Sequence, residues 1–90
     1  MCQLTVTYPN SADDALVNSV TKTLIGEIEK ATTKAGVFNG FKYLNYAAFF
    51  QDPLSSYGPQ NKATLQAVSK KYDPSGLFQT GVPGGFKLFK

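Results

Sequence analysis

The sequence predicts an α+β fold, a small β-α-β-α unit that ends in a glycine-rich C-terminal tail. Two short stretches have the alternation or the aromatic content of strands, two longer stretches repeat apolar residues at helical spacing, and Pro, Gly and Asn separate them. The 90 residues are enough for a single domain. Because two strands cannot make a stable sheet alone, we expect the unit to complete its sheet by dimerisation.

The first half of the chain predicts a strand and a long helix. The strand is expected over residues 2–8, where the letters CQLTVTY alternate apolar and polar side chains. The helix is expected over about residues 12–35, because apolar residues recur there at intervals of three and four. Ser11 and Asp14 have the spacing of a capping box at its start, and Gly36 is placed to end it in a left-handed conformation.

The second half predicts a strand, a helix and a tail. The strand is expected over residues 41–47, after an Asn-Gly turn, and alternation along it would place Tyr43 and Tyr46 on opposite faces. The helix is expected to begin at Pro59, which suits a first helical turn, and to end at Asp73, before a proline. The last ten residues, GVPGGFKLFK, are expected to be irregular.

The amino-acid types present exclude several classes of site. The chain has no histidine and a single cysteine, Cys2, which excludes an internal disulfide, a zinc site and a histidine-assisted nucleophile. All nine basic residues are lysines scattered along the chain, and without arginine we expect no binding to nucleic acid. No apolar run approaches the roughly 20 residues of a transmembrane helix, and the N-terminus lacks a signal-peptide pattern. A soluble, cytoplasmic protein with no membrane partner is therefore expected.

Three stretches carry a resemblance to a known family. The run YLNYA at residues 43–47, with KKYDPSGLFQ and VPGGFKL further on, resembles the C-terminal end of FAD-linked oxidases of the berberine bridge enzyme-like family, particularly its fungal members. The resemblance covers nearly all of residues 1–90. It implies that Tyr46 matches a residue that acts as catalytic base in several members, that Asn45 matches a residue near the flavin, and that Tyr43 lies close to the substrate pocket.

The chain departs from the family pattern in two ways. Many relatives carry an acidic residue two places after the tyrosine that Tyr46 matches, whereas this chain has Ala48. The flavin-binding domain of the family, with the histidine and often a cysteine for covalent attachment of FAD, has no counterpart in this sequence. We therefore expect no cofactor here.

Three functions remain open. The favoured one is a cofactor-independent isomerase or cyclase of fungal secondary metabolism, which acts on a small, largely apolar metabolite. The alternatives are a non-catalytic remnant or binding module, and a split half of an FAD-linked oxidase that needs a separate flavin-binding chain. In the favoured function Tyr46 is the catalytic residue, as acid–base group or hydrogen-bond donor. The expected substrate-binding residues are Phe41, Tyr43, Asn45, Phe49 and Phe50.

The composition also predicts a homodimer. A two-stranded unit leaves one face of its sheet uncovered, and the aromatic residues Phe49, Phe50, Phe86 and Phe89 add apolar surface. Pairing of two copies would bury these groups without a disulfide. We expect light scattering at micromolar concentration to give twice the mass of the chain, and a monomer mass would contradict the prediction.

Overall fold

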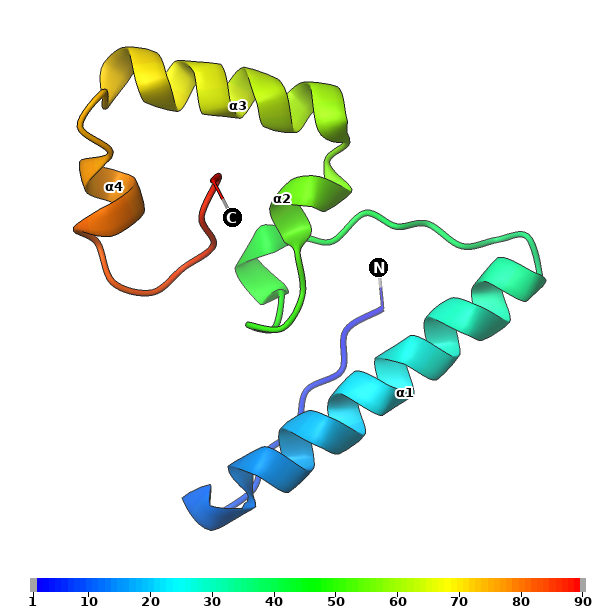
Figure 1. Cartoon of the computed structure of the whole chain (residues 1–90). Helices are drawn as coiled ribbons and strands as arrows, with labels where there is room; N and C mark the ends of the chain where they lie inside the picture. The colour runs from blue at the N-terminus through cyan, green and yellow to red at the C-terminus, as the bar shows by residue number, and fades with distance from the viewer. Residues whose placement is uncertain (1, 90) are drawn as a thin grey trace. The chain divides into compact units, whose positions relative to one another are not determined.

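The computed structural model describes residues 2–89, which form two compact units with their boundary between Asn39 and Gly40 (Figure 1). Every regular element within residues 2–89 is helical, and no strand forms there, so the predicted α+β fold is wrong. An alternating pattern makes a strand only where a neighbouring strand accepts and donates its backbone hydrogen bonds. Neither of the two predicted strands finds such a neighbour.

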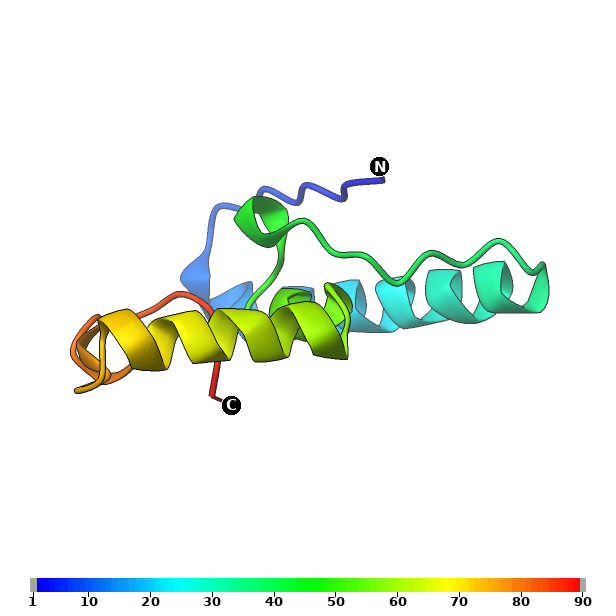
Figure 2. The same ribbon diagram turned by 90° about the horizontal axis from the view of Figure 1, so that it is seen from above.

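The first unit consists of an irregular N-terminal segment, the 3₁₀ turn η1 (Ser11–Asp13) and the 21-residue helix α1 (Asp14–Lys34), drawn in blue to cyan in Figures 1 and 2. Residues 2–8, where a strand was predicted, have no regular structure. Their last residue, Tyr8, is tied to the helix because its hydroxyl donates to Asp14 Oδ1 at 2.6 Å. This hydrogen bond raises the pKa of the Tyr8 hydroxyl.

Helix α1 confirms the predicted long helix, but the side-chain cap found here belongs to η1, which precedes it. The Asn10 side chain accepts a hydrogen bond from the Ala12 N–H at 3.0 Å, and Asp13 makes no side-chain cap. The C-terminal end of α1 is followed, as predicted, by a left-handed Gly36, which has a φ of 73°. The N–H groups of Gly36 and of the next residue, Val37, donate to carbonyls in the last helical turn, each at 3.0 Å, which is the Schellman arrangement.

The second unit contains the 3₁₀ turn η2 (Leu44–Tyr46) and three helices, α2 (Pro53–Ser56), α3 (Pro59–Tyr72) and α4 (Leu77–Thr80) (Figure 1). The predicted strand over residues 41–47 is replaced by η2. Helix α3 confirms the predicted second helix. The helices α2 and α4 are four residues long, too short to show a helical period in the sequence.

The irregular tail after α4 is held by side chains from two helices. Gln66 of α3 donates through Nε2 to the Leu88 carbonyl at 2.7 Å, and Gln79 of α4 accepts from the Leu88 N–H at 2.8 Å. The Lys87 ammonium donates to the Val82 carbonyl at 2.7 Å. The two glutamine bonds thus pair the backbone N–H and carbonyl of Leu88, as a neighbouring strand would in a sheet.

Little apolar surface is buried. Within residues 2–89 only Pro53 and Leu54, both in α2, fall in the buried class. Nineteen large apolar side chains among these residues are exposed. A folded 90-residue domain is expected to bury about 60 to 65% of the surface of its unfolded chain around a core. No helix within residues 2–89 has the length and apolar content needed to cross a membrane.

The Asp73 carboxylate holds the start of α4, and this makes the helix sensitive to pH. Its oxygens accept hydrogen bonds from the N–H groups of Leu77 and Phe78, each at 2.9 Å. These bonds hold the pKa of Asp73 below its usual value, and the bond from Phe78 is the largest cause. A lowered pKa in the folded state means that the carboxylate stabilises the turn above about pH 4, and that this stabilisation is lost as pH falls through the folded pKa.

We therefore predict that protection of the Leu77 and Phe78 amides from hydrogen exchange, corrected for the intrinsic rate, falls on acidification from pH 6 to pH 2. In Asp73→Asn the amide oxygen can replace only one carboxylate oxygen, so protection at neutral pH is lower and no longer depends on pH. Asp52→Asn is the matched control, because Asp52 caps α2 through the Ser55 N–H at 3.0 Å and should leave α4 unchanged. Equal pH dependence in wild type and Asp73→Asn would contradict the role of Asp73.

Candidate functional site

The turn η2 brings together two tyrosines that a strand would separate. Residues three apart lie one above the other in a 3₁₀ turn, so Tyr43 and Tyr46 point to the same side. Their ring centroids are 5.3 Å apart and the rings meet edge to face at 79°. Hydrogen bonds from the Tyr46 N–H to the Tyr43 carbonyl (3.1 Å) and from the Ala47 N–H to the Leu44 carbonyl (3.4 Å) close the turn. We call Tyr43 and Tyr46 the tyrosine pair.

Asn45 orients one member of the tyrosine pair. Its Nδ2 donates a hydrogen bond to Tyr43 Oη at 2.9 Å. Because the Tyr43 oxygen is the acceptor in this bond, its own proton points elsewhere and is available to an external acceptor. Tyr46 is 60% exposed and Tyr43 is 42% exposed, so both rings are open to a ligand.

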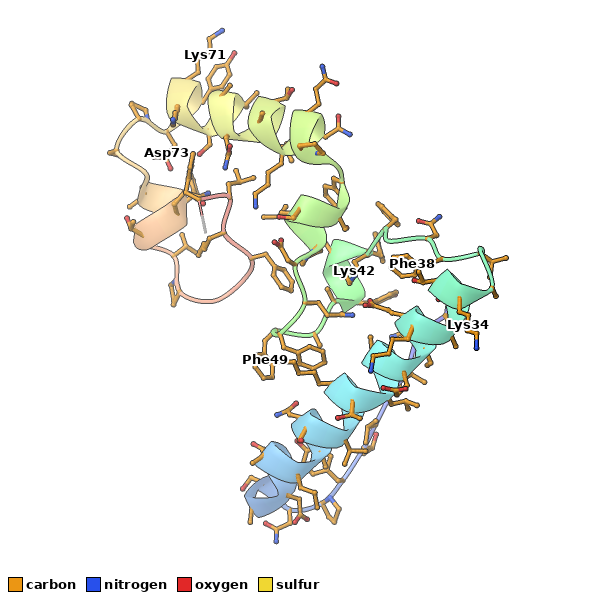
Figure 3. All side chains as sticks on the ribbon, turned by 45° about the vertical axis from the view of Figure 1, so that its right-hand side comes forward. Lys34, Phe38, Lys42, Phe49, Lys71 and Asp73 are labelled. Atoms are coloured by element: carbon orange, nitrogen blue, oxygen red, sulfur yellow. The ribbon has the colours of Figure 1, made fainter. Side chains whose placement is uncertain are left out.

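The predicted phenylalanines form two further ring pairs. Phe49 and Phe50 meet edge to face with centroids 5.5 Å apart, at a turn after η2 where Figure 3 shows Phe49. Phe41 stacks on Tyr57, with centroids 5.5 Å apart and an angle of 22° between the rings. Tyr57 was not among the site residues selected from the sequence. Its contact with Phe41 joins the segment before η2 to the residue that follows α2.

The segment before η2 is hydrogen-bonded to α2, which contains both buried residues of the described part of the chain. The Lys42 N–H donates to Ser56 Oγ at 2.9 Å, and the Ser56 hydroxyl donates to the Pro53 carbonyl at 2.6 Å. On the other side of η2, Ala48 and Gln51 exchange two hydrogen bonds, one of them from the Ala48 N–H to Gln51 Oε1 at 3.0 Å. The tyrosine pair is thus held by hydrogen bonds on both sides.

Charges of both signs lie at the start of α2. Hydrogen bonds from Ser55 are the main cause that lowers the pKa of Asp52, and the charges of Lys62 and Lys42 lower it further. Both lysines therefore lie near enough to act on a carboxylate at the start of α2.

A second feature lies in the first unit. A shallow hollow follows the last turns of α1, where Figure 3 shows Lys34 and Phe38. It is lined by Gly26, Glu29, Lys30, Thr33, Lys34 and Phe38. One of its two lysines, Lys30, is paired with Glu27 at 2.6 Å. None of the predicted site residues lines this hollow.

The chemistry of the site is that of binding and hydrogen bonding. Within residues 2–89, no three Cys, Asp or Glu side chains gather as a metal site requires. The rings of the tyrosine pair and of Phe41, Phe49 and Phe50 offer apolar faces to a flat ligand, and the Tyr43 and Tyr46 hydroxyls can donate to a carbonyl oxygen. The catalytic role of Tyr46 and the substrate-binding roles of the other residues stay predictions.

Comparison with known proteins gives consistent matches. The chain is 43% identical over 83 residues to the FAD-dependent monooxygenase drtC of Aspergillus calidoustus, covering 92% of this chain and 16% of that protein. It is 42% identical over 81 residues to the FAD-dependent monooxygenase sdcF of Emericella nidulans, covering 90% and 17%. It is 45% identical over 76 residues to the bifunctional solanapyrone synthase of Alternaria solani, covering 84% and 15%.

The chain thus spans about one-sixth of the length of the curated relatives it matches. No family model matches the chain, and no solved structure is found to be similar to it. The three relatives confirm the resemblance that the run YLNYA predicted.

Proposed function

This chain is related to fungal FAD-dependent monooxygenases and FAD-linked oxidases of secondary metabolism, and on that premise we propose that it forms the substrate-facing aromatic side of the active site of such an enzyme. Polypeptide beyond the matched sixth of these enzymes supplies the opposite side and holds the flavin. The substrate is a small, largely apolar metabolite, because the surface offered to it consists of rings with few polar atoms.

The exposure of the predicted site residues supports this proposal most strongly. Ligand pockets bury about 70 to 90% of a ligand's surface. Tyr46, Phe41 and Phe49 are 60%, 59% and 76% exposed, so each of these rings is open to a ligand on one side, and we propose that together they form one wall of a pocket. A wall of this kind becomes a pocket when a second surface faces it.

The small buried core supports the same proposal. With only Pro53 and Leu54 buried among residues 2–89, this part of the chain has little hydrophobic stabilisation of its own. The relatives have about six times as many residues as the matched segment, enough to cover the exposed apolar side chains.

The residues of this chain do not fit the flavin itself. The sequence has no histidine for covalent attachment. Its glycine-rich stretch, with Gly84 and Gly85 at positive φ, leads into the irregular tail rather than into a helix whose N-terminal N–H groups could hold a diphosphate. The proposal therefore gives this chain no flavin-binding residue and no step that passes through the flavin.

Within the proposed site each polar group has a separate task. Asn45 holds the Tyr43 oxygen, which leaves the Tyr43 proton free to fix the orientation of a substrate oxygen. Tyr46, in contact with the Tyr43 ring, donates its proton to a substrate carbonyl or takes part in proton transfer at that oxygen.

A second candidate is the cofactor-independent isomerase or cyclase. Its support is that the contacts among Tyr43, Asn45 and Tyr46 form within this chain alone. This reaction requires an enclosed, dry pocket around Tyr46. Because Tyr46 is 60% exposed, we favour instead a site that further polypeptide of the flavoenzyme completes. A non-catalytic binding module would use the same rings without turnover. The homodimer stays a prediction under each of these functions, although the sheet pairing that first suggested it does not exist within residues 2–89.

The role of Tyr46 is tested in a chimera. The segment of drtC that matches this chain is replaced by residues 1–90, and Tyr46→Phe is introduced. This change removes one hydroxyl and keeps the ring that contacts Tyr43. We predict that turnover of the host enzyme's own substrate falls by about 10²- to 10⁴-fold, the usual contribution of a general acid or base. Flavin absorbance after gel filtration should not change.

Tyr72→Phe is the matched control, because Tyr72 is an exposed tyrosine on α3 outside the proposed site, with 74% of its surface accessible. It should keep both turnover and flavin. Full turnover in Tyr46→Phe would show that the proposed site is not the working one. Turnover by the purified chain alone, without flavin, would favour the isomerase or cyclase.

A further inference from the structure

We propose that Ser56 is a positioning residue for the tyrosine pair, because its hydroxyl fixes the backbone at Lys42, the residue before Tyr43. The inference deepens the proposed function and rests on it for the effect on turnover. Ser56 belongs to α2 and was not among the site residues selected from the sequence. It lies 14 residues from Lys42 along the chain, so neither a helical nor a strand period links the two.

The Ser56 hydroxyl accepts one hydrogen bond and donates another. Its oxygen accepts from the Lys42 N–H at 2.9 Å, and its proton goes to the Pro53 carbonyl at 2.6 Å. Because the second bond fixes where the proton points, a lone pair of the oxygen is left for the Lys42 N–H. Both bonds are partly buried, so water competes less for these groups than at an exposed site.

Helix α2 is a suitable fixed point for the Lys42 backbone. It contains Pro53 and Leu54, the two buried residues within residues 2–89, and it contacts α3. The Asp52 carboxylate caps its start and accepts from the Ser55 N–H at 3.0 Å. A side chain on a packed and capped turn opens less often than one on an exposed loop. The bond from Ser56 therefore places Lys42 relative to the best-packed part of the second unit.

A ring contact beside this bond adds a second constraint. Phe41 stacks on Tyr57 with centroids 5.5 Å apart, so residues 41 and 42 contact residues 57 and 56 respectively. Two adjacent contacts fix a direction as well as a point, because rotation of the chain about one of them would break the other. The backbone therefore enters η2 in one orientation.

The position of the Lys42 backbone acts on both members of the tyrosine pair. Tyr43 follows Lys42 directly and begins η2 without a side-chain cap of its own. The Tyr43 carbonyl accepts from the Tyr46 N–H at 3.1 Å, so a shift of the backbone at Lys42 moves both tyrosines. A misplacement of about 1 Å can lower turnover by about 10²-fold. Ser56 would thus affect turnover without touching the substrate.

The placement of the tyrosine pair is tested in the isolated chain by NMR. Ser56→Ala removes the acceptor of the Lys42 N–H. We expect the Lys42 amide to exchange at least about tenfold faster, and the nuclear Overhauser effects between the Tyr43 and Tyr46 rings to weaken. Exchange in α3 should not change, which would show that the fold is kept. Ser56→Thr should restore the wild-type values, because a helical threonine can bond the carbonyl three residues back through Oγ1.

Ser55→Ala is the matched control. It removes a hydroxyl from the same helix, one that accepts from the Lys62 ammonium at 2.7 Å, and it keeps the N–H that bonds Asp52. It should leave the Lys42 amide and the ring contact unchanged. Equal effects of the two alanine variants, or unchanged ring contacts in Ser56→Ala, would overturn the positioning role.

The effect on catalysis is measured in the drtC chimera. Ser56→Ala should lower kcat by about 10- to 10²-fold, with flavin absorbance after gel filtration unchanged, and Ser56→Thr should keep turnover. Added to Tyr46→Phe, Ser56→Ala should lower turnover by less than about threefold more, because the hydroxyl that it positions is already gone. A merely structural role would lower turnover by the same factor in both backgrounds, and that result would overturn the proposal.

The two variants separate this inference from the proposed function. If Tyr46→Phe lowers turnover and Ser56→Ala does not, the proposed function stands and Ser56 is not a positioning residue. If Tyr46→Phe keeps full turnover, the proposed function fails, and the NMR result decides by itself whether Ser56 places the tyrosine pair.

Discussion

The irregular backbone of this chain depends on hydrogen bonds from its own side chains. Outside the helices there is no sheet within residues 2–89 to pair N–H and C=O groups, and a backbone group left unpaired away from water is costly. The side chain of Asn10 bonds the segment before α1, and those of Ser56 and Gln51 bond the segments before and after η2. The Asp73 carboxylate bonds the turn into α4. The two glutamines that bond Leu88 do the same for the tail.

The parts of the fold that could be predicted from the sequence are those with local causes. The period of α1, the left-handed Gly36 and the proline that begins α3 act within a few residues, and all three predictions are confirmed. A strand has no local cause of the same kind, because its stability depends on a partner. The alternating residues 2–8 and the aromatic residues 41–47 have none within residues 2–89, and both segments are irregular or turned.

The candidate site shows the same limit. The family resemblance selected Tyr43, Asn45 and Tyr46, and the structure brings them into contact, but through a geometry that the strand prediction excluded. On a strand Tyr43 and Tyr46 would lie on opposite faces. Tyr57 was not selected as a site residue; its ring stacks on Phe41, next to the hydrogen bond from the Lys42 N–H to Ser56 Oγ, a contact that the sequence pattern does not reveal. Sequence identifies the chemical groups here, and the hydrogen bonds decide which of them meet.

The 3₁₀ turn at η2 has a consequence for how this segment can evolve. The tyrosine pair meets because two residues separate its members and one turn of a 3₁₀ helix takes three. A substitution at Leu44 leaves that spacing unchanged. Insertion or deletion of a single codon between Tyr43 and Tyr46 would rotate one ring by roughly 120° and part the pair. In natural variants of this stretch, insertions and deletions should therefore be rarer than amino-acid substitutions.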